Sequence, residues 1–190
     1  MPPPTDTVTP ASKLASALAD ADLWLRRGVV ELAPPSDAWA YAFRELHAIL
    51  ASGAPDAVVA IEHIGSTSVP GLDAKPIMDV GIGVRSGMPL ASLDEWLIGL
   101  GMLLRGDANE VRPDRMFGYE LEPMIRLVNV HVLEHDSREW RDYVDFRDHL
   151  RGHPDDRRAY GALKRDLAAQ HPDDRLAYID GKEPFILSRR

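Results

Sequence analysis

Two apolar runs rich in β-branched residues, joined by a polar loop, constrain the fold more than any other feature of this chain. The runs are residues 57–64, "AVVAIEHI", and residues 76–84, "PIMDVGIGV". Their nearly unbroken apolar character predicts two strands in a sheet that is covered on both faces. The joining stretch, residues 63–72, reads "HIGSTSVPGL" and has more hydroxyl groups and glycines than a tight turn requires. It is therefore a candidate ligand-binding loop.

The rest of the chain alternates helical and extended patterns before it becomes wholly helical after Ser137. Apolar spacing and capping residues predict one domain over residues 12–190, behind a Pro/Thr-rich tail, residues 1–11, that is expected to be disordered. The fold class is α/β (α+β), a mixed sheet flanked by helices with a helical C-terminal third. The expected helices are 12–27, 36–52, 89–100 and three after Ser137, the last over 176–187, with the breaks at Pro154 and Pro172 suited to helix starts; the further strands are 29–32, 116–121 and 125–134.

Composition limits the function classes. The chain has 190 residues, no cysteine and a net charge of −8. A chain this acidic is not expected to bind extended nucleic acid, and thiolate chemistry is excluded. No apolar run approaches the roughly 18 residues of a membrane span, and the N-terminus lacks the pattern of a secretory signal. We expect a cytoplasmic enzyme or ligand-binding protein whose partner is a small molecule rather than a membrane; the sequence does not indicate an oligomeric state.

The polar loop has the composition of a phosphate-binding site. Gly65 allows a sharp turn and a close approach of ligand to the backbone. Lys75 follows within reach and adds a positive charge. The alternative is a polar connection with a turn at residues 70–71. The loop hydroxyls that would bind phosphate oxygens are those of Ser66, Thr67 and Ser68.

Asp79 interrupts the second apolar strand. An ionised carboxylate is costly there unless it is paired or bound to a metal ion. It follows the Gly-Ser turn by one strand, so the loop would hold phosphates while Asp79 holds Mg²⁺ or another divalent metal. The alternative is an aspartate that caps a neighbouring segment.

Two histidines and two arginines complete the candidate set. His131 lies among valines in the strand 125–134, and with His63 and Asp79 it would form a catalytic acid/base set or a group of metal ligands. The alternative for His131 is a buried core histidine. Arg115 and Arg126 would bind phosphate, or else form surface salt bridges. Lys164 fits a solvated helical face.

The stretch "EHIGSTSVPGLDAKPIMDV", residues 62–80, resembles the signature of the GrpB family, a nucleotidyltransferase-like family with the fold of the DNA polymerase beta catalytic core. The resemblance implies a nucleotidyltransferase-like mixed sheet and a Gly-Ser turn that binds a nucleoside triphosphate. Gly65, Ser66 and Asp79 match that pattern. The similarity extends over most of the chain, through residues 29–39, 129–134, 139–168 and 183–187.

The chain departs from the superfamily pattern at two of its three expected carboxylates. Position 81 is glycine, and the strand expected to supply the third acid offers Asn129 and His131. One carboxylate cannot hold two Mg²⁺ ions against a polyphosphate. Three functions remain open: a transferase moving a nucleotidyl or phosphoryl group to a small acceptor, a non-catalytic nucleotide- or anion-binding module, and a metal-dependent enzyme acting on another small substrate.

Overall fold

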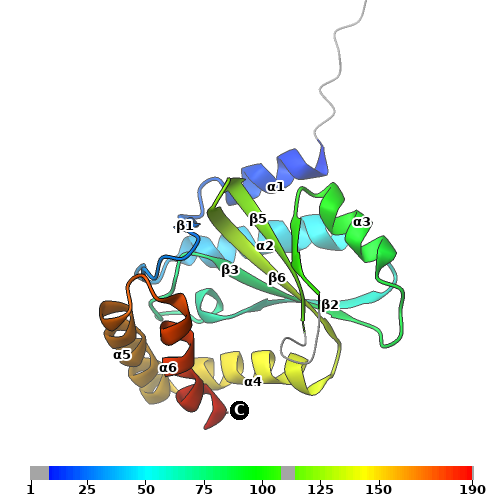
Figure 1. Ribbon diagram of the computed structural model, residues 1–190. Helices are drawn as coiled ribbons and strands as arrows, with labels where there is room; N and C mark the ends of the chain where they lie inside the picture. The colour runs from blue at the N-terminus through cyan, green and yellow to red at the C-terminus, as the bar shows by residue number, and fades with distance from the viewer. Residues whose placement is uncertain (1–8, 108–113, 190) are drawn as a thin grey trace, which may run out of the picture.

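A six-stranded mixed sheet forms the centre of the computed structural model, which describes residues 9–107 and 114–189 (Figure 1). The strand order is β2-β3-β6-β5-β4, with β1 paired to β6. β3 and β6 run parallel, and the other pairs are antiparallel. The strands are β1 Leu25–Arg26, β2 Val58–Ile64, β3 Met78–Val84, β4 Leu103–Gly106, β5 Arg115–Glu122 and β6 Ile125–Glu134.

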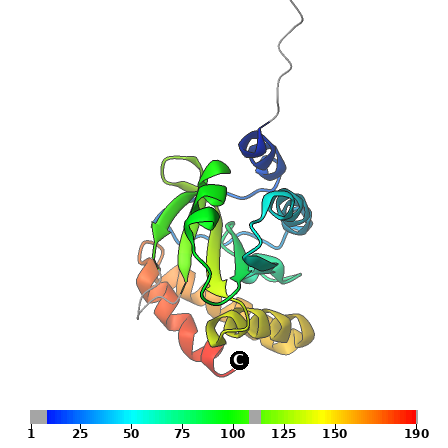
Figure 2. The ribbon, with the colours of Figure 1, turned by 90° about the vertical axis from the view of Figure 1, so that its right-hand side faces the viewer.

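Helices cover both faces of the sheet (Figures 1 and 2). The first three pack on one face, and the C-terminal three lie on the other, with α5 and α6 side by side. A short 3₁₀ turn, η1, spans Ser66–Ser68 after β2. The helices are α1 Pro10–Leu18, α2 Asp37–Gly53, α3 Ala91–Gly99, α4 Arg138–Gly152, α5 Pro154–Gln170 and α6 Arg175–Leu187.

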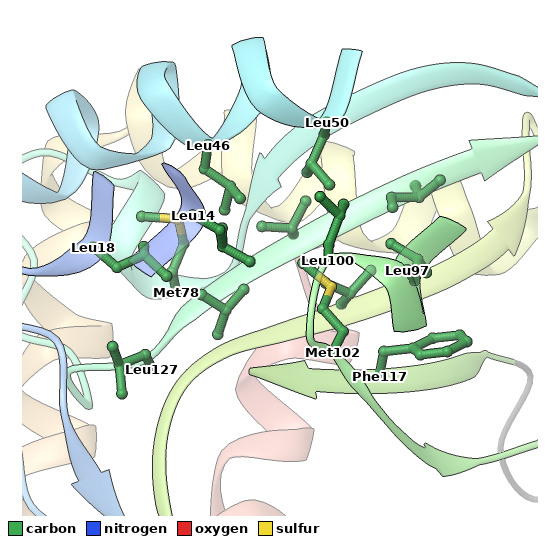
Figure 3. Packing of buried hydrophobic residues seen from close by; sticks show 14 of the residues in the cluster. Leu14, Leu18, Leu46, Leu50, Met78, Leu97, Leu100, Met102, Phe117 and Leu127 are labelled. Carbon is green, nitrogen blue, oxygen red and sulfur yellow. The ribbon is translucent and has the colours of Figure 1, made fainter. Parts of the chain in front are cut away.

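The main hydrophobic core lies between the sheet and the helices α1, α2 and α3. Leu14, Leu46 and Leu97 point from these helices toward the sheet, where Met78 and Phe117 meet them (Figure 3). All five side chains are fully buried. Burial of each such side chain contributes about 1.5–3 kcal/mol to stability, so this face carries much of the stability of the fold.

The structure confirms the mixed α/β class, the two-sided sheet and the helical C-terminal end, but it corrects several expected elements. The helix expected over 12–27 is Pro10–Leu18, because the chain turns at Asp22, whose φ is 50°. The segment 29–32 is not a strand, and Ala33 next to it forms only an isolated bridge. The last helix, Arg175–Leu187, agrees with the expected range 176–187, but its capping residue is Asp174, so Pro172 lies before its start.

Most of the tail expected to be disordered, residues 1–8, lies outside the described residues. Of the chain that is described, no helix is long and apolar enough to span a membrane.

Candidate functional site

Gly65 and Asp79 lie directly against each other where β2 ends and β3 begins. Ile64 pairs with Asp79 across the two strands. Gly65 has a φ of 68°, and a Cβ at this position would collide with the Asp79 carboxylate. Glycine is therefore required both for the backbone turn and for the space. The sequence predicts this closeness of loop and aspartate.

Asp79 is held by two side chains of β6. Its Oδ1 accepts a hydrogen bond of 2.8 Å from Asn129 Nδ2 and lies 3.6 Å from His131 Nε2. Burial alone would raise the pKa of Asp79. The contact with His131 and the hydrogen bond from Asn129 lower it by a larger amount, so the pKa lies below its usual value. Asp79 is therefore ionised at neutral pH.

His131 bridges two carboxylates. Its Nδ1 lies 2.6 Å from Asp114 Oδ2, and the hydroxyl of Tyr143 is 3.5 Å from the same nitrogen. Burial lowers the pKa of His131, but the contacts with Asp114 and Asp79 outweigh it and raise that pKa to about 9. With this pKa the ring is an imidazolium at neutral pH, a form that can donate a proton or pair with an anion but does not act as a general base.

His63 does not join Asp79 and His131. It pairs with Val80, which packs in the core beneath α2, and its ring stacks on Phe43 of α2 at 4.6 Å. Side chains alternate between the faces of a strand, so His63 and Asp79 lie on opposite faces of the sheet. Burial lowers the pKa of His63 to about 4, which leaves it neutral. The expected convergence of all three residues is wrong, because the sheet separates them.

The three loop hydroxyls have different roles. Thr67 Oγ1 lies 3.0 Å from His63 Nε2, and Ser68 Oγ donates to the carbonyl of Gly65 at 2.6 Å. Both residues are buried, so their hydroxyls stabilise the turn itself. Ser66 is half-buried, and its Oγ accepts a hydrogen bond of 3.0 Å from Lys164 Nζ on α5.

Lys75 and Lys182 lie close enough to Asp79 to interact with it, and Lys164 lies close to Lys182. Burial lowers the pKa of Lys75 and of Lys182 to about 8 and that of Lys164 to about 7. Lys75 also lowers the pKa of Lys182, whereas Asp79 raises it. Close cations repel one another, so an anionic ligand at this place would relieve an existing cost.

A cavity of about 290 Å³, which we call the basic cavity, opens beside this cluster. Asn129 contributes to its wall and links it to Asp79. Among the described residues that line it there is no carboxylate. Three lining residues, Arg105, Arg126 and Asn129, have buried polar atoms without a hydrogen-bond partner in the described chain, although Arg105 forms an ion pair with Glu120. The cationic side chains of the lining are Arg26, Arg27, Lys75, Arg105, Arg126 and Arg175.

Of the two arginines expected to bind phosphate, only Arg126 lines this cavity. Arg115 instead makes a bidentate salt bridge to Asp94 of α3, with distances of 2.9 and 2.6 Å, and a further ion pair with Asp107. These partners lie at the α3 side of the sheet. Its expected role in phosphate binding is not supported, because the guanidinium is already neutralised there.

The surroundings of Asp79 fit a divalent cation poorly. Within the described ranges, no group of three or more His, Asp or Glu side chains is arranged to hold a metal ion. Asp79 already faces the His131 imidazolium, and Lys75 and Lys182 add further positive charge nearby. Mg²⁺ prefers several hard, anionic oxygen ligands, which this donor set does not supply.

Several site residues were not identified from the sequence. Lys164, expected on a solvated face, is only 1% exposed. Its spacing from Tyr160 and Leu167 places it on the apolar face of its helix, a signal that could have revealed its burial. Asp114 and Lys182 gave no comparable signal, because their roles depend on tertiary packing.

The fold and site define a class: a mixed α/β protein with a basic cavity beside an ionised aspartate. The chain belongs to the GrpB family, because the family model described as "GrpB protein" matches residues 29–189. In the crystal structure of conserved protein GrpB from Enterococcus faecalis, the similar region covers 83% of this chain and 93% of that one, with a TM-score of 0.71 and 31% identity.

Curated relatives agree with this assignment. The UPF0157 protein YqkA of Bacillus subtilis is 37% identical over 157 residues, which are 83% of this chain and 45% of that protein. The Glutamate-rich protein GrpB of Alkalihalophilus pseudofirmus is 26% identical over 166 residues, 86% of this chain and 95% of that protein. The chain thus spans less than half the length of YqkA but nearly the whole length of the second relative.

Proposed function

We propose that this protein binds a nucleotide or another phosphate-bearing small molecule in the basic cavity beside Asp79. The observation that carries the proposal is the charge of the cavity. Six cationic side chains line it in a chain whose net charge is −8; Arg105 is paired with Glu120, whereas Arg126 Nε lacks a hydrogen-bond partner among the described residues. Cations concentrated in a concave site attract anions, and a guanidinium matches the geometry of phosphate oxygens.

Of the residues that match the nucleotidyltransferase pattern, Asp79 is linked to the cavity wall through its hydrogen bond from Asn129. Gly65 brings the loop that carries Ser66 against Asp79, as a phosphate-binding turn beside a strand carboxylate would require. With phosphates on Lys75 and Arg126, the ionised Asp79 would accept a proton from an acceptor hydroxyl during nucleotidyl or phosphoryl transfer. Such transfer is the catalytic form of the proposal.

The packing around Gly81 leaves no room for a second carboxylate at this position, which favours phosphate binding without one. A Cβ at this position would lie 3.2 Å from the Trp140 ring and 3.4 Å from Ile64. The space in which a second carboxylate would project is therefore filled by α4. This packing supports phosphate recognition by cations over a mechanism with two metal ions.

Isothermal titration calorimetry tests the proposal. Inorganic pyrophosphate and nucleoside triphosphates would be titrated into the full chain, once with Mg²⁺ and once with a chelator. We expect binding in both conditions, and Arg126→Ala should weaken it about 10- to 100-fold, since a charge-assisted hydrogen bond contributes about 1.5–3 kcal/mol.

Arg158→Ala is the matched control, because Arg158 carries the same charge, is exposed and, among the described residues, forms its ion pair with Asp155 of α5. It should bind phosphate like the unaltered chain. Absence of binding by every phosphate compound, or equal losses in the two variants, would contradict the proposal. Release of pyrophosphate with added acceptors would establish the catalytic form.

A further inference from the structure

Ser66 and Lys164 form a close hydroxyl–amine pair from segments that are 98 residues apart in sequence. Lys164 Nζ lies 3.0 Å from Ser66 Oγ, and the same nitrogen donates to the backbone carbonyl of Asp73. Lys164 is buried, whereas Ser66 is half-buried at the start of η1. The hydroxyl is therefore held by a buried amine in a residue that keeps part of its surface exposed.

The environment of Lys164 favours its neutral form. Both hydrogen bonds of its amine go to uncharged oxygens, and the carboxylate of Asp73 pairs instead with Arg165 at 2.5 Å. Burial, with Lys182 nearby, lowers the pKa of Lys164 to about 7. A neutral amine can donate to the Asp73 carbonyl while its lone pair accepts the hydroxyl proton.

The neighbouring hydroxyls lack this arrangement. Thr67 is buried against the neutral ring of His63, and the Ser68 hydroxyl donates to the Gly65 carbonyl. Ser66 alone of the three loop hydroxyls meets a lysine. A serine activated by a neutral lysine is a known form of nucleophile in enzymes that carry out group transfer.

We propose that Ser66 is a nucleophile and Lys164 its general base, acting on a phosphoryl group of the ligand. The choice of a phosphoryl substrate rests on the proposed function. Ser66 Oγ forms a bond to phosphorus while its proton passes to Lys164 Nζ. The bond from phosphorus to the leaving oxygen breaks, and that oxygen takes the proton from Lys164. Water then attacks the phosphoserine, which releases phosphate and restores the hydroxyl.

Labelling with diisopropyl fluorophosphate tests this pair without any natural ligand. The reagent forms a phosphoserine ester with loss of fluoride, and intact-protein and peptide mass spectrometry locate the adduct. We expect one adduct, on Ser66. Its rate should rise about tenfold per pH unit below pH 7 and level off above it, because the reaction follows the neutral fraction of the amine.

Three variants make the test specific. Ser66→Ala should abolish labelling but keep the bond from Lys164 to the Asp73 carbonyl, so the fold should persist. Lys164→Arg should slow labelling at least about 100-fold, because a guanidinium is not a base at these pH values. Ser52→Ala, on the exposed end of α2, should label like the unaltered chain. Thermal melting would verify that each variant is folded.

Two outcomes would overturn the proposal that Ser66 is a nucleophile activated by Lys164. One is the absence of an adduct on the folded, unaltered chain, and the other is an adduct that still forms in Ser66→Ala. Calorimetry with pyrophosphate separates this result from the proposed function. Phosphate binding without labelling refutes the nucleophile and leaves the binding proposal intact. Labelling of Ser66 without phosphate binding supports the pair and refutes the proposed ligand class.

Discussion

The two faces of the central sheet differ along the same strands. On β3, Met78, Val80 and Ile82 pack into the core beneath α1, α2 and α3, whereas Asp79 and Gly81 face the other way. On β6, valines at 128, 130 and 132 alternate with Asn129 and His131. One face is built for close packing and the other for charged groups. If the proposed ligand binds beside Asp79, stability and ligand binding depend on opposite sides of one sheet.

The largest expected effect comes from the packed face. Leu46→Ala removes a fully buried side chain of the main core and should lower the free energy of unfolding by about 2–5 kcal/mol. Chemical denaturation measures this loss. Pyrophosphate affinity of the remaining folded protein should be unchanged. A weakening of more than about threefold would show that the two faces are not independent.

The two buried histidines sharpen the comparison, because each belongs to one face. At pH 7 His131 should be protonated and His63 neutral, since their pKa values are about 9 and about 4. NMR titration of the imidazole resonances would observe both states directly. Equal titration of the two rings near pH 6.5 would remove the electrostatic distinction between the faces.

The sign of the pH effect follows from these values. His131 has a raised pKa in the folded state, so its stabilising contribution is complete below pH 6.5 and is lost as the pH rises to about 9. A shift of this size corresponds to about 3 kcal/mol. The stability difference between the unaltered chain and His131→Gln should therefore be larger at pH 6 than at pH 9.5. His63 acts oppositely and destabilises the fold as the pH falls from 6.5 to 4.

The sequence predicts the packed face better than the charged one. β-Branched runs identify β2 and β3, and the glycine turn with the strand aspartate correctly anticipates that Gly65 meets Asp79. The two strands and the approach of Gly65 to Asp79 could be predicted because they involve segments that are close together in the sequence. The first helix ends early because the polar turn around Asp22 competes with the helical spacing of the apolar residues.

The contacts of the candidate site residues, on either face, depend on packing between distant segments, which periodicity does not encode. The strand register sends His63 to the face opposite Asp79, and the position of α3 pairs Arg115 with Asp94. Lys164 and Lys182 reach the site only because α5 and α6 fold back against the loop. Spacing along one segment could not have supplied these contacts.

The smallest expected effect is that of Lys75→Met. It separates stability from ligand binding most clearly, because the two should change in opposite directions. Lys75→Met removes a partly buried cation from the basic cavity. Its pKa is lowered from 10.5 to about 8, so keeping it charged costs folding energy below pH 8, and this cost fades as the pH rises to 10.5. At pH 7 the variant should be up to about 1 kcal/mol more stable after solvent screening, yet bind pyrophosphate more weakly. Lys13→Met, an exposed change on α1, is the control and should alter neither property. A less stable Lys75→Met protein with unchanged affinity would mean that Lys75 supports the fold rather than the ligand, since a cation retained for binding is expected to cost stability in the empty site.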